Sequence, residues 1–94
     1  MTDNRIQQIA NINGTDTILN KLTEECGELI TAIARSQSTE FKVDAYPEEY
    51  FEDMIEEAVD TMIMIEQLRL QCPFMFDLMK ETKIERQCER MGIK

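Results

Sequence analysis

Apolar residues recur along most of the chain at steps of three and four positions. In the first half, such steps join Ile18, Leu19, Leu22, Cys26, Leu29, Ile30 and Ile33. In the second half, they join Phe51, Met54, Ile55, Ala58, Val59, Met62, Ile65 and Leu68. This spacing is typical of one face of an α-helix, and no segment alternates at the period of two that marks a half-buried strand. The pattern therefore predicts an all-α fold built on two long helices.

Start and stop signals set the bounds of these helices. Thr15 is a typical helix-start residue, and we expect the first long helix to end near Ser36–Gln37. The second is expected to begin at Pro47, which suits a first helical turn, and to end at Cys72-Pro73. The polar stretch 37–46 between them is predicted to be irregular.

Two further helices are predicted at the ends of the chain. The first covers 2–12 and is broken by Asn13-Gly14. The last runs from Phe74 to about Met91 and stops at Gly92. Because the 94 residues show no repeat and no second domain, residues 1–94 are expected to form a single domain.

The core of such a domain is small. Only 43% of the residues are hydrophobic and Trp is absent. At residues 61–65 (TMIMI) the second helix is apolar nearly all round, so it must be covered on more than one side. We expect another subunit to supply this cover, in a homodimer or homotetramer.

The charge of the chain limits its partners. It holds 19 acidic and 10 basic residues, a formal net charge of −9, which argues against binding a nucleic-acid polymer. A free nucleotide remains possible, because bound divalent metal ions would reverse the local sign of the charge. No apolar run approaches the roughly 18 residues that a membrane span needs, and the start of the chain lacks signal-peptide character. We therefore expect a cytoplasmic protein with no membrane partner.

The absence of histidine excludes several kinds of site. With three cysteines, no CxxC and no histidine, a zinc site is not expected, nor is a histidine general base. Carboxylate di-iron centres use Glu-x-x-His motifs and are excluded for the same reason. Cys26, Cys72 and Cys88 are interpreted as small residues in or near a reduced core.

Two pairs of acidic residues lie three positions apart, Glu25 with Glu28 and Glu57 with Asp60. Residues at this spacing share a helix face, and both pairs lie at the margin of an apolar stripe. Packing the two helices together would bring four carboxylates into one pocket, which is costly without a compensating cation. Oxygen ligands without nitrogen or sulfur suit Mg²⁺ or Mn²⁺.

Such a pocket suits the hydrolysis of a phosphoanhydride. Bound divalent ions polarise a phosphoryl group and lower the pKa of a bound water. Glu24 is a candidate to take the proton from that water. The competing interpretation is a solvated acidic face, which is the usual role of acid-rich helical runs such as 48–56.

The motif residues resemble a known family. EECGEL at 24–29 and EEAVDTMIMI at 56–65 are similar to the E-E-x-x-E and E-x-x-D motifs of the MazG-like all-α NTP pyrophosphatases. Relatives of that family are the dimeric dUTPases, the dCTP pyrophosphatases and phosphoribosyl-ATP pyrophosphohydrolase. The resemblance covers about residues 18–90. Histidine is common after the second motif in the phosphoribosyl-ATP branch, so its absence weighs against that branch.

The resemblance implies a fold, an activity and a set of site residues. The fold is a MazG-like helical bundle, completed by oligomerisation. The activity is cleavage of a nucleoside triphosphate between its α and β phosphates, giving monophosphate and pyrophosphate, in house-cleaning or control of the dNTP pool. The implied metal ligands are Glu25, Glu28, Glu57 and Asp60, with Glu24 and Glu25 as catalytic residues. The implied cofactor is Mg²⁺, with Mn²⁺ as a substitute.

Further residues are assigned to the substrate. Lys21, at the start of the first motif, and Lys83 and Arg86, in a basic late segment, are expected to approach the phosphates. Phe41 and Tyr46 are candidates to stack on the base. The alternative function is a helical module that binds nucleotide, metal or a protein partner without turnover.

Overall fold

The part of the chain described by the computed structural model, residues 4–37 and 47–94, consists of helices apart from the bend at Cys72 and the last three residues. The helices are α1 (Asn4–Gln37), α3 (Pro47–Gln71) and α4 (Pro73–Met91). The all-α prediction and the expected end of the last helix near Met91 are thus confirmed. Within the described residues, no helix is long and apolar enough to cross a membrane.

Gly14 bends α1 into two helical segments. Its backbone, with φ 75° and ψ 165°, is non-helical and lies where residues other than glycine are strained. The predicted break at Asn13-Gly14 is therefore present. On either side of the bend, the side-chain amide of Asn13 donates to Gln67 Oε1 at 2.8 Å, and the Thr15 hydroxyl donates to Gln71 Oε1 at 2.9 Å. These bonds fix the bend against the end of α3.

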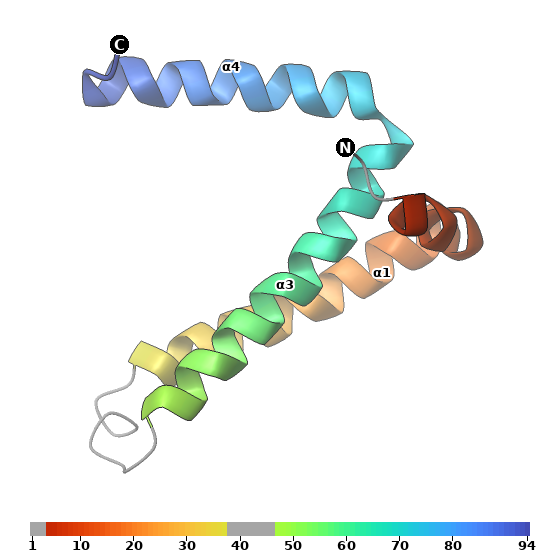
Figure 1. The fold of residues 1–94 in the computed structure, drawn as a ribbon, viewed down its shortest axis with the longest axis vertical. Helices are drawn as coiled ribbons and strands as arrows, with labels where there is room; N and C mark the ends of the chain where they lie inside the picture. The colour runs from red at the N-terminus through yellow and green to blue at the C-terminus, as the bar shows by residue number, and fades with distance from the viewer. Residues whose placement is uncertain (1–3, 38–46) are drawn as a thin grey trace.

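After the bend, α1 and α3 form an antiparallel hairpin (Figure 1). The residues buried or half-buried between them recur at alternating steps of four and three, the spacing of two helices that pack side by side. We call this set the contact seam. It consists of Ile18, Leu22, Glu25, Leu29, Ala32 and Ser36 on α1, and of Tyr50, Met54, Glu57, Thr61, Met64 and Leu68 on α3.

The apolar core lies at one end of this seam. Ala10, Ile18 and Met64 form its buried centre, and Leu22 and Leu68 pack against it. Ala10 comes from the segment before the bend, so Gly14 directs that segment back across the hairpin. The other buried apolar residue of the described chain, Ala32, lies toward the opposite end of the seam.

Helix α4 leaves the hairpin at Cys72-Pro73 and extends away from it (Figure 1). Among the described residues, it contacts the end of α3 and not α1. It ends at Gly92, whose φ of 70° allows the backbone N–H groups of Gly92 and Ile93 to bond back to Glu89 and Cys88. No residue of α4, which is described throughout, is buried.

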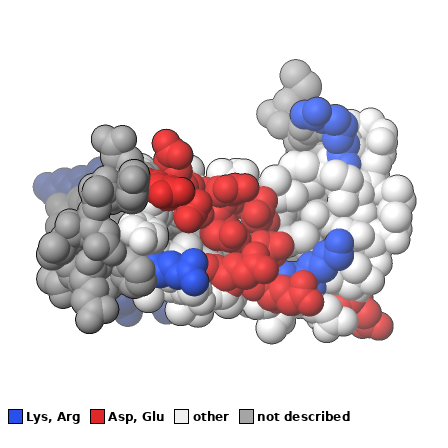
Figure 2. All heavy atoms as spheres, turned by 90° about the horizontal axis from the view of Figure 1, so that it is seen from below, with Lys and Arg blue, Asp and Glu red and all other residues white. Residues whose placement is uncertain are grey.

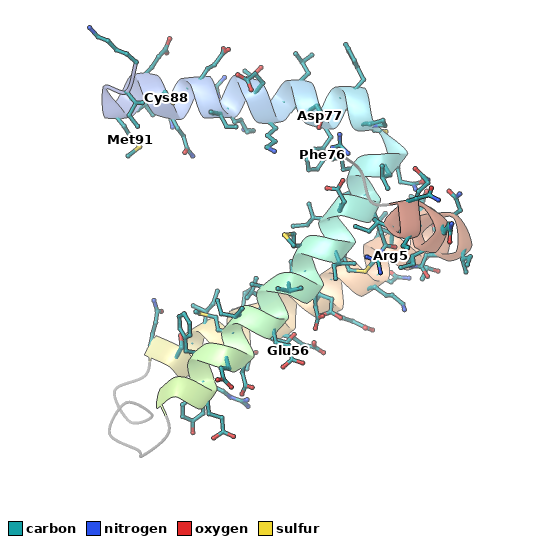
Figure 3. The ribbon with its side chains drawn as sticks, viewed as in Figure 1. Arg5, Glu56, Phe76, Asp77, Cys88 and Met91 are labelled. Carbon is teal, nitrogen blue, oxygen red and sulfur yellow. The ribbon has the colours of Figure 1, made fainter. Side chains whose placement is uncertain are left out.

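The expectation that the cysteines lie in or near the core is wrong for the single chain. Cys26 and Cys72 are exposed, Cys88 is half-buried, and all three are free thiols. The reason is that α3 covers only one side of α1, and Cys26 lies one position beyond the contact seam. Cys88 lies on α4, which packs on nothing along most of its length (Figure 3).

Candidate metal and nucleotide site

Two glutamates occupy positions of the contact seam that would ordinarily be apolar. Glu25 lies between Leu22 and Leu29 in the seam of α1, and Glu57 lies between Met54 and Thr61 in that of α3. Both are half-buried. The sequence analysis placed them at the margin of an apolar stripe, whereas the structure places them within the helix–helix contact.

These two glutamates meet Glu28. Each of Glu25, Glu28 and Glu57 offers a carboxylate oxygen, and the three oxygens lie within 4.8 Å of one another. Glu28 is exposed, so the cluster opens to solvent on that side. Oε2 of Glu25 and Oε2 of Glu57 are buried and have no hydrogen-bond partner among the described residues. Because a buried carboxylate oxygen without a partner is costly, the donor set fits a cation that has hard oxygen ligands.

The electrostatics of the cluster agree with that fit. Burial raises the pKa of Glu25 above its ordinary value, and the charges of Glu28, Asp60 and Glu24 raise it further. The pKa of Glu57 is also raised, first by burial and then by a hydrogen bond and the charge of Glu28. Without a cation, these groups therefore hold protons to a higher pH than free carboxyls do.

Asp60 and Glu24 lie near the three-carboxylate cluster but outside it. The negative charge of Asp60 contributes to the raised pKa of both Glu25 and Glu57. Its oxygens lie outside the group that falls within 4.8 Å. Glu24 is exposed and lines the pocket beside the cluster. The structure therefore brings the carboxylates of Glu25, Glu28 and Glu57 within 4.8 Å of one another and leaves Asp60 and Glu24 at the edge.

The residues just before the seam positions form one side of the hairpin, which we call the acidic face. Seen from one end of the hairpin, the chain turns clockwise along one helix and anticlockwise along the other, because the two helices run in opposite directions. Positions that precede the seam therefore lie on the same side of both helices. Figure 2 shows acidic side chains gathered in one continuous band over the hairpin. The acidic face consists of Lys21, Glu24, Glu28, Thr31 and Arg35 on α1, and of Glu49, Asp53, Glu56 and Asp60 on α3.

An open pocket of about 750 Å³ lies on the acidic face. Its lining includes four carboxylates and several small residues, and consists of Glu24, Gly27, Glu28, Thr31, Ala32, Arg35, Tyr50, Asp53 and Glu57. Gly27 has nothing within 4 Å of the position of a Cβ atom, so its small size does not serve a close helix crossing. The interpretation that Gly27 leaves room for a ligand agrees with its place in the lining.

Sequence reasoning did not identify Arg35 as a site residue, although it is the one cation among the described lining residues. The spacing of Arg35 from the first acidic motif could have shown that it lies beside the site. Glu24, Glu28, Thr31 and Arg35 follow one another at steps of four, three and four, so they share a helix face. Sequence reasoning did not identify Tyr50 either, because the pattern does not specify how the two helices pair.

A buried hydroxyl connects the two cluster-bearing helices. Thr61 Oγ1 lies 2.8 Å from the backbone carbonyl of Glu57 and 3.3 Å from that of Glu25. Thr61 is 5% exposed and has one hydroxyl proton to donate. The shorter bond stays within α3, and the longer contact to Glu25 spans the two helices beside the carboxylate cluster.

The remaining predicted substrate residues lie elsewhere. Lys21 is exposed on the acidic face, one helical turn from Glu25. Lys83 and Arg86 are on α4, where they line a shallow depression with Leu78, Met79 and Thr82. Neither of them lines the pocket beside the carboxylates. Phe41 and Tyr46 lie outside the described residues.

Comparisons with known proteins give no relative. No protein-family model matches the chain, and no characterised protein or solved structure is significantly similar to it. The site must therefore be interpreted from its own residues. They form a three-carboxylate cluster with two unpartnered buried oxygens, open to a pocket that also presents one guanidinium and one phenol.

Proposed function

We propose that the chain is a Mg²⁺-dependent nucleoside triphosphate pyrophosphohydrolase of the MazG-like kind. The observation that carries this proposal is the pair of buried, unpartnered oxygens, Oε2 of Glu25 and Oε2 of Glu57, beside Glu28. A half-buried cluster of this kind is destabilising by itself and would be compensated by a bound divalent cation.

Each residue of the site has a role in this proposal. Glu25, Glu28 and Glu57 hold the metal, and Asp60 completes the negative field around them. Bound Mg²⁺ would supply charge neutralisation at the phosphates and a bound water of lowered pKa. Glu24, exposed beside the cluster, accepts the water proton. Arg35 and Lys21 offset the remaining phosphate charge from the acidic face.

The reaction is a hydrolysis at the α-phosphorus. The water oxygen forms a bond to that phosphorus, and the phosphoanhydride bond to the β-phosphate breaks. The electron pair of the broken bond leaves with pyrophosphate, and the products are a nucleoside monophosphate and pyrophosphate. In this proposal Tyr50, which lines the pocket from α3, contacts the sugar or the base.

The test is pyrophosphate release from a panel of ribo- and deoxynucleoside triphosphates, with Mg²⁺ and with EDTA. We expect release from one or a few of them with Mg²⁺ and none with EDTA. The variants Glu25→Gln and Asp60→Asn should abolish turnover while helicity stays near native. The matched control is Glu52→Gln, an exposed acid of α3 outside the acidic face, which should keep full activity. Full activity in Glu25→Gln would show that the site assignment is wrong.

A second candidate is a binding module that holds metal or nucleotide without turnover. The observation in its favour is that Arg35 is the one cation among the described lining residues, against four carboxylates. A triphosphate would need more positive charge than that to bind in productive geometry. Isothermal titration with nucleotide and Mg²⁺ separates the two candidates, because tight binding without pyrophosphate release favours the module.

A further inference from the structure

Two oppositely charged side chains lie at the same height on the two helices that form the pocket. Arg35 comes from α1 and Asp53 from α3, and both line the pocket on the acidic face. Their height along the hairpin follows from the residues directly after them, because Ser36 Oγ lies 3.5 Å from Met54 Sδ. Since Arg35 and Asp53 each precede a seam residue, they also lie on the same side of the hairpin.

These two side chains are not paired with each other. In the described part of the chain, the structure has no ion pair between Arg35 and Asp53, although both are exposed and line one pocket. A guanidinium has only hydrogen-bond donors, and an ionised carboxylate has only acceptors. Together they offer parallel N–H groups and two carboxylate oxygens to a ligand that enters the pocket.

The carboxylate cluster lies toward the other end of the same pocket. Arg35 follows Glu28 by seven positions on α1, and Asp53 precedes Glu57 by four positions on α3. At about 1.5 Å per residue, these steps are about 10 Å and about 6 Å along the helix axes. The pocket volume of about 750 Å³ is within the range of small-ligand sites. A nucleotide whose phosphates lie at the cluster would therefore have its base at the height of Arg35 and Asp53.

The charges at the two ends of the pocket suit different parts of a nucleotide. The cluster of Glu25, Glu28 and Glu57 suits a divalent cation, and the cation suits phosphates. At the other end, the carboxylate of Asp53 balances the guanidinium of Arg35, so a phosphate there would meet a negative as well as a positive charge. An uncharged group that has both donors and acceptors fits this end better. Arg35 still adds positive charge to the pocket, while its hydrogen bonds are left for the base.

The common bases differ in how their donors and acceptors are arranged. Guanine has two adjacent acceptors, O6 and N7, which a guanidinium matches with two parallel N–H groups. It also has two adjacent donors, N1–H and the 2-amino group, which match the two oxygens of a carboxylate. Cytosine has adjacent acceptors but a single donor group. In adenine the one amino group lies between two separated acceptors, and in uracil and thymine the one N–H lies between two carbonyls. Guanine alone therefore matches both side chains fully.

We propose that the pocket selects a guanine nucleotide, with Arg35 donating to O6 and N7 of the base and Asp53 accepting from N1–H and the 2-amino group. This inference rests on the proposed function, because the cluster must hold the phosphates for the base to lie at this height. Tyr50, half-buried and one helical turn from Asp53, adds an aromatic ring on which the base stacks. Arg35 and Asp53 determine specificity here, since neither touches the phosphoanhydride that breaks.

The test measures the binding of α,β-methylene nucleoside triphosphates, which are not cleaved between the α and β phosphates, by isothermal titration with Mg²⁺. We expect the guanosine analogue to bind at least about tenfold more tightly than the adenosine, cytidine and uridine analogues. Arg35→Lys keeps the charge but lacks the planar pair of donors. It should weaken binding of the guanosine analogue at least about fivefold and that of the adenosine analogue less than about twofold. Equal affinities for all the analogues, or equal losses in Arg35→Lys, would overturn the proposal.

Asp53→Asn should reverse a preference rather than only weaken binding. An amide offers one acceptor and one donor group, which match N1–H and the 2-carbonyl of xanthine. The variant should therefore bind the xanthosine analogue more tightly than the guanosine analogue, whereas the wild type does the reverse. The matched control is Glu52→Gln, at the preceding exposed position and outside the pocket lining, which should keep the wild-type preference. An Asp53→Asn variant that still favours the guanosine analogue would also overturn the proposal.

Pyrophosphate release from GTP tests the proposed function separately. A guanine preference in binding without pyrophosphate release would support this inference and contradict the proposed hydrolysis. Magnesium-dependent pyrophosphate release, together with equal binding of all the analogues, would support the hydrolysis and overturn this inference. If none of the analogues binds, this inference is overturned whatever the hydrolysis assay gives.

Discussion

Glu25 and Glu57 are the residues on which the proposed function depends, since they place two carboxylates within a largely apolar helix contact. Any apolar residue at either position would pack better against the neighbouring leucines and methionines. A carboxylate there is explained if the metal-free chain is not the working state. On the proposed function, the chain gives up stability in the contact seam, and a bound Mg²⁺ would restore it.

This view predicts a pH dependence of metal stabilisation. The pKa values of Glu25 and Glu57 are raised above the ordinary 4.5 in the folded chain, so their contribution to stability is full below that value and is lost as pH rises through the raised values. Mg²⁺ competes with these protons. The increase in Tm on adding Mg²⁺ should therefore grow as the pH rises above 4.5, which a thermal shift series with and without EDTA would measure.

The Glu25→Gln variant isolates this effect from the other titrating groups. The pKa of Asp77, for example, is lowered by its hydrogen bond from Arg69, so its contribution to stability has the opposite pH dependence. In Glu25→Gln, the increase in Tm with Mg²⁺ should be much smaller at every pH. An equal increase in both proteins would place the metal elsewhere.

Thr61 gives a prediction about positioning. Thr61→Val keeps the shape of the side chain and removes the hydroxyl that contacts the carbonyls of Glu25 and Glu57. We expect the free energy of unfolding to fall by about 1 kcal/mol and Mn²⁺ affinity to fall severalfold. The control is Thr82→Val, which loses a comparable bond to the carbonyl four residues earlier, on α4. Equal Mn²⁺ affinities in the two variants would limit Thr61 to a structural role.

At the scale of the helices, the bounds are set by local signals that sequence shows directly. Pro47 and Pro73 begin helices, and Gly14 and Gly92 interrupt or end them through their positive φ values. These residues act on their own neighbourhood, so the fold class and the helix ends were predictable. The resemblance to a MazG-like bundle goes further than the bounds, and it remains a prediction.

The pairing of the helices was not predictable in the same way. Both α1 and α3 carry two adjacent apolar stripes, one in the contact seam and one of exposed residues such as Ile30 on α1 and Met62 on α3. A single sequence does not show which stripe meets the other helix. For that reason Glu25 appeared marginal rather than central, and Arg35 was missed. At the α3–α4 bend, Arg69 donates two hydrogen bonds to the carboxylate of Asp77, and this contact between two helices is not encoded by any local pattern.

Two glycines of α1 provide a matched pair of predictions at this scale. Gly14 has φ 75° and ψ 165°, so Gly14→Ala should lower the free energy of unfolding by about 1–3 kcal/mol. Gly27 is helical with open space around it, so Gly27→Ala should raise it by about 1 kcal/mol. Urea titrations of both variants would measure these changes. A neutral Gly14→Ala would mean that α1 does not bend there in solution.

For the molecule as a whole, the shape is more extended than that of a compact domain of this length. The radius of gyration is 16.7 Å, against about 12 Å for a compact chain of 94 residues. Its extents of 46, 41 and 23 Å reflect the projection of α4 away from the hairpin. Little of the chain is buried in the isolated form, so stability and association are expected to be coupled.

This coupling predicts that stability depends on protein concentration. Because only the folded chain presents its exposed apolar residues, among them Met62, for the expected association, the Tm of the wild type should rise with concentration. The Tm of Met62→Glu should be lower and independent of concentration. Differential scanning calorimetry over a hundredfold range of concentration would measure both. A wild-type Tm that stays constant would indicate that the hairpin and α4 are stable alone.

The most direct test of the central claim is a Mn²⁺ titration followed by electron paramagnetic resonance, since free Mn²⁺ alone gives the strong signal. The wild type should remove Mn²⁺ from the free pool at neutral pH, and excess Mg²⁺ should release it. Glu57→Gln should lose this binding and Glu52→Gln should keep it. If the wild type leaves all Mn²⁺ free, or if Glu57→Gln binds as the wild type does, then the cluster of Glu25, Glu28 and Glu57 is not a metal site.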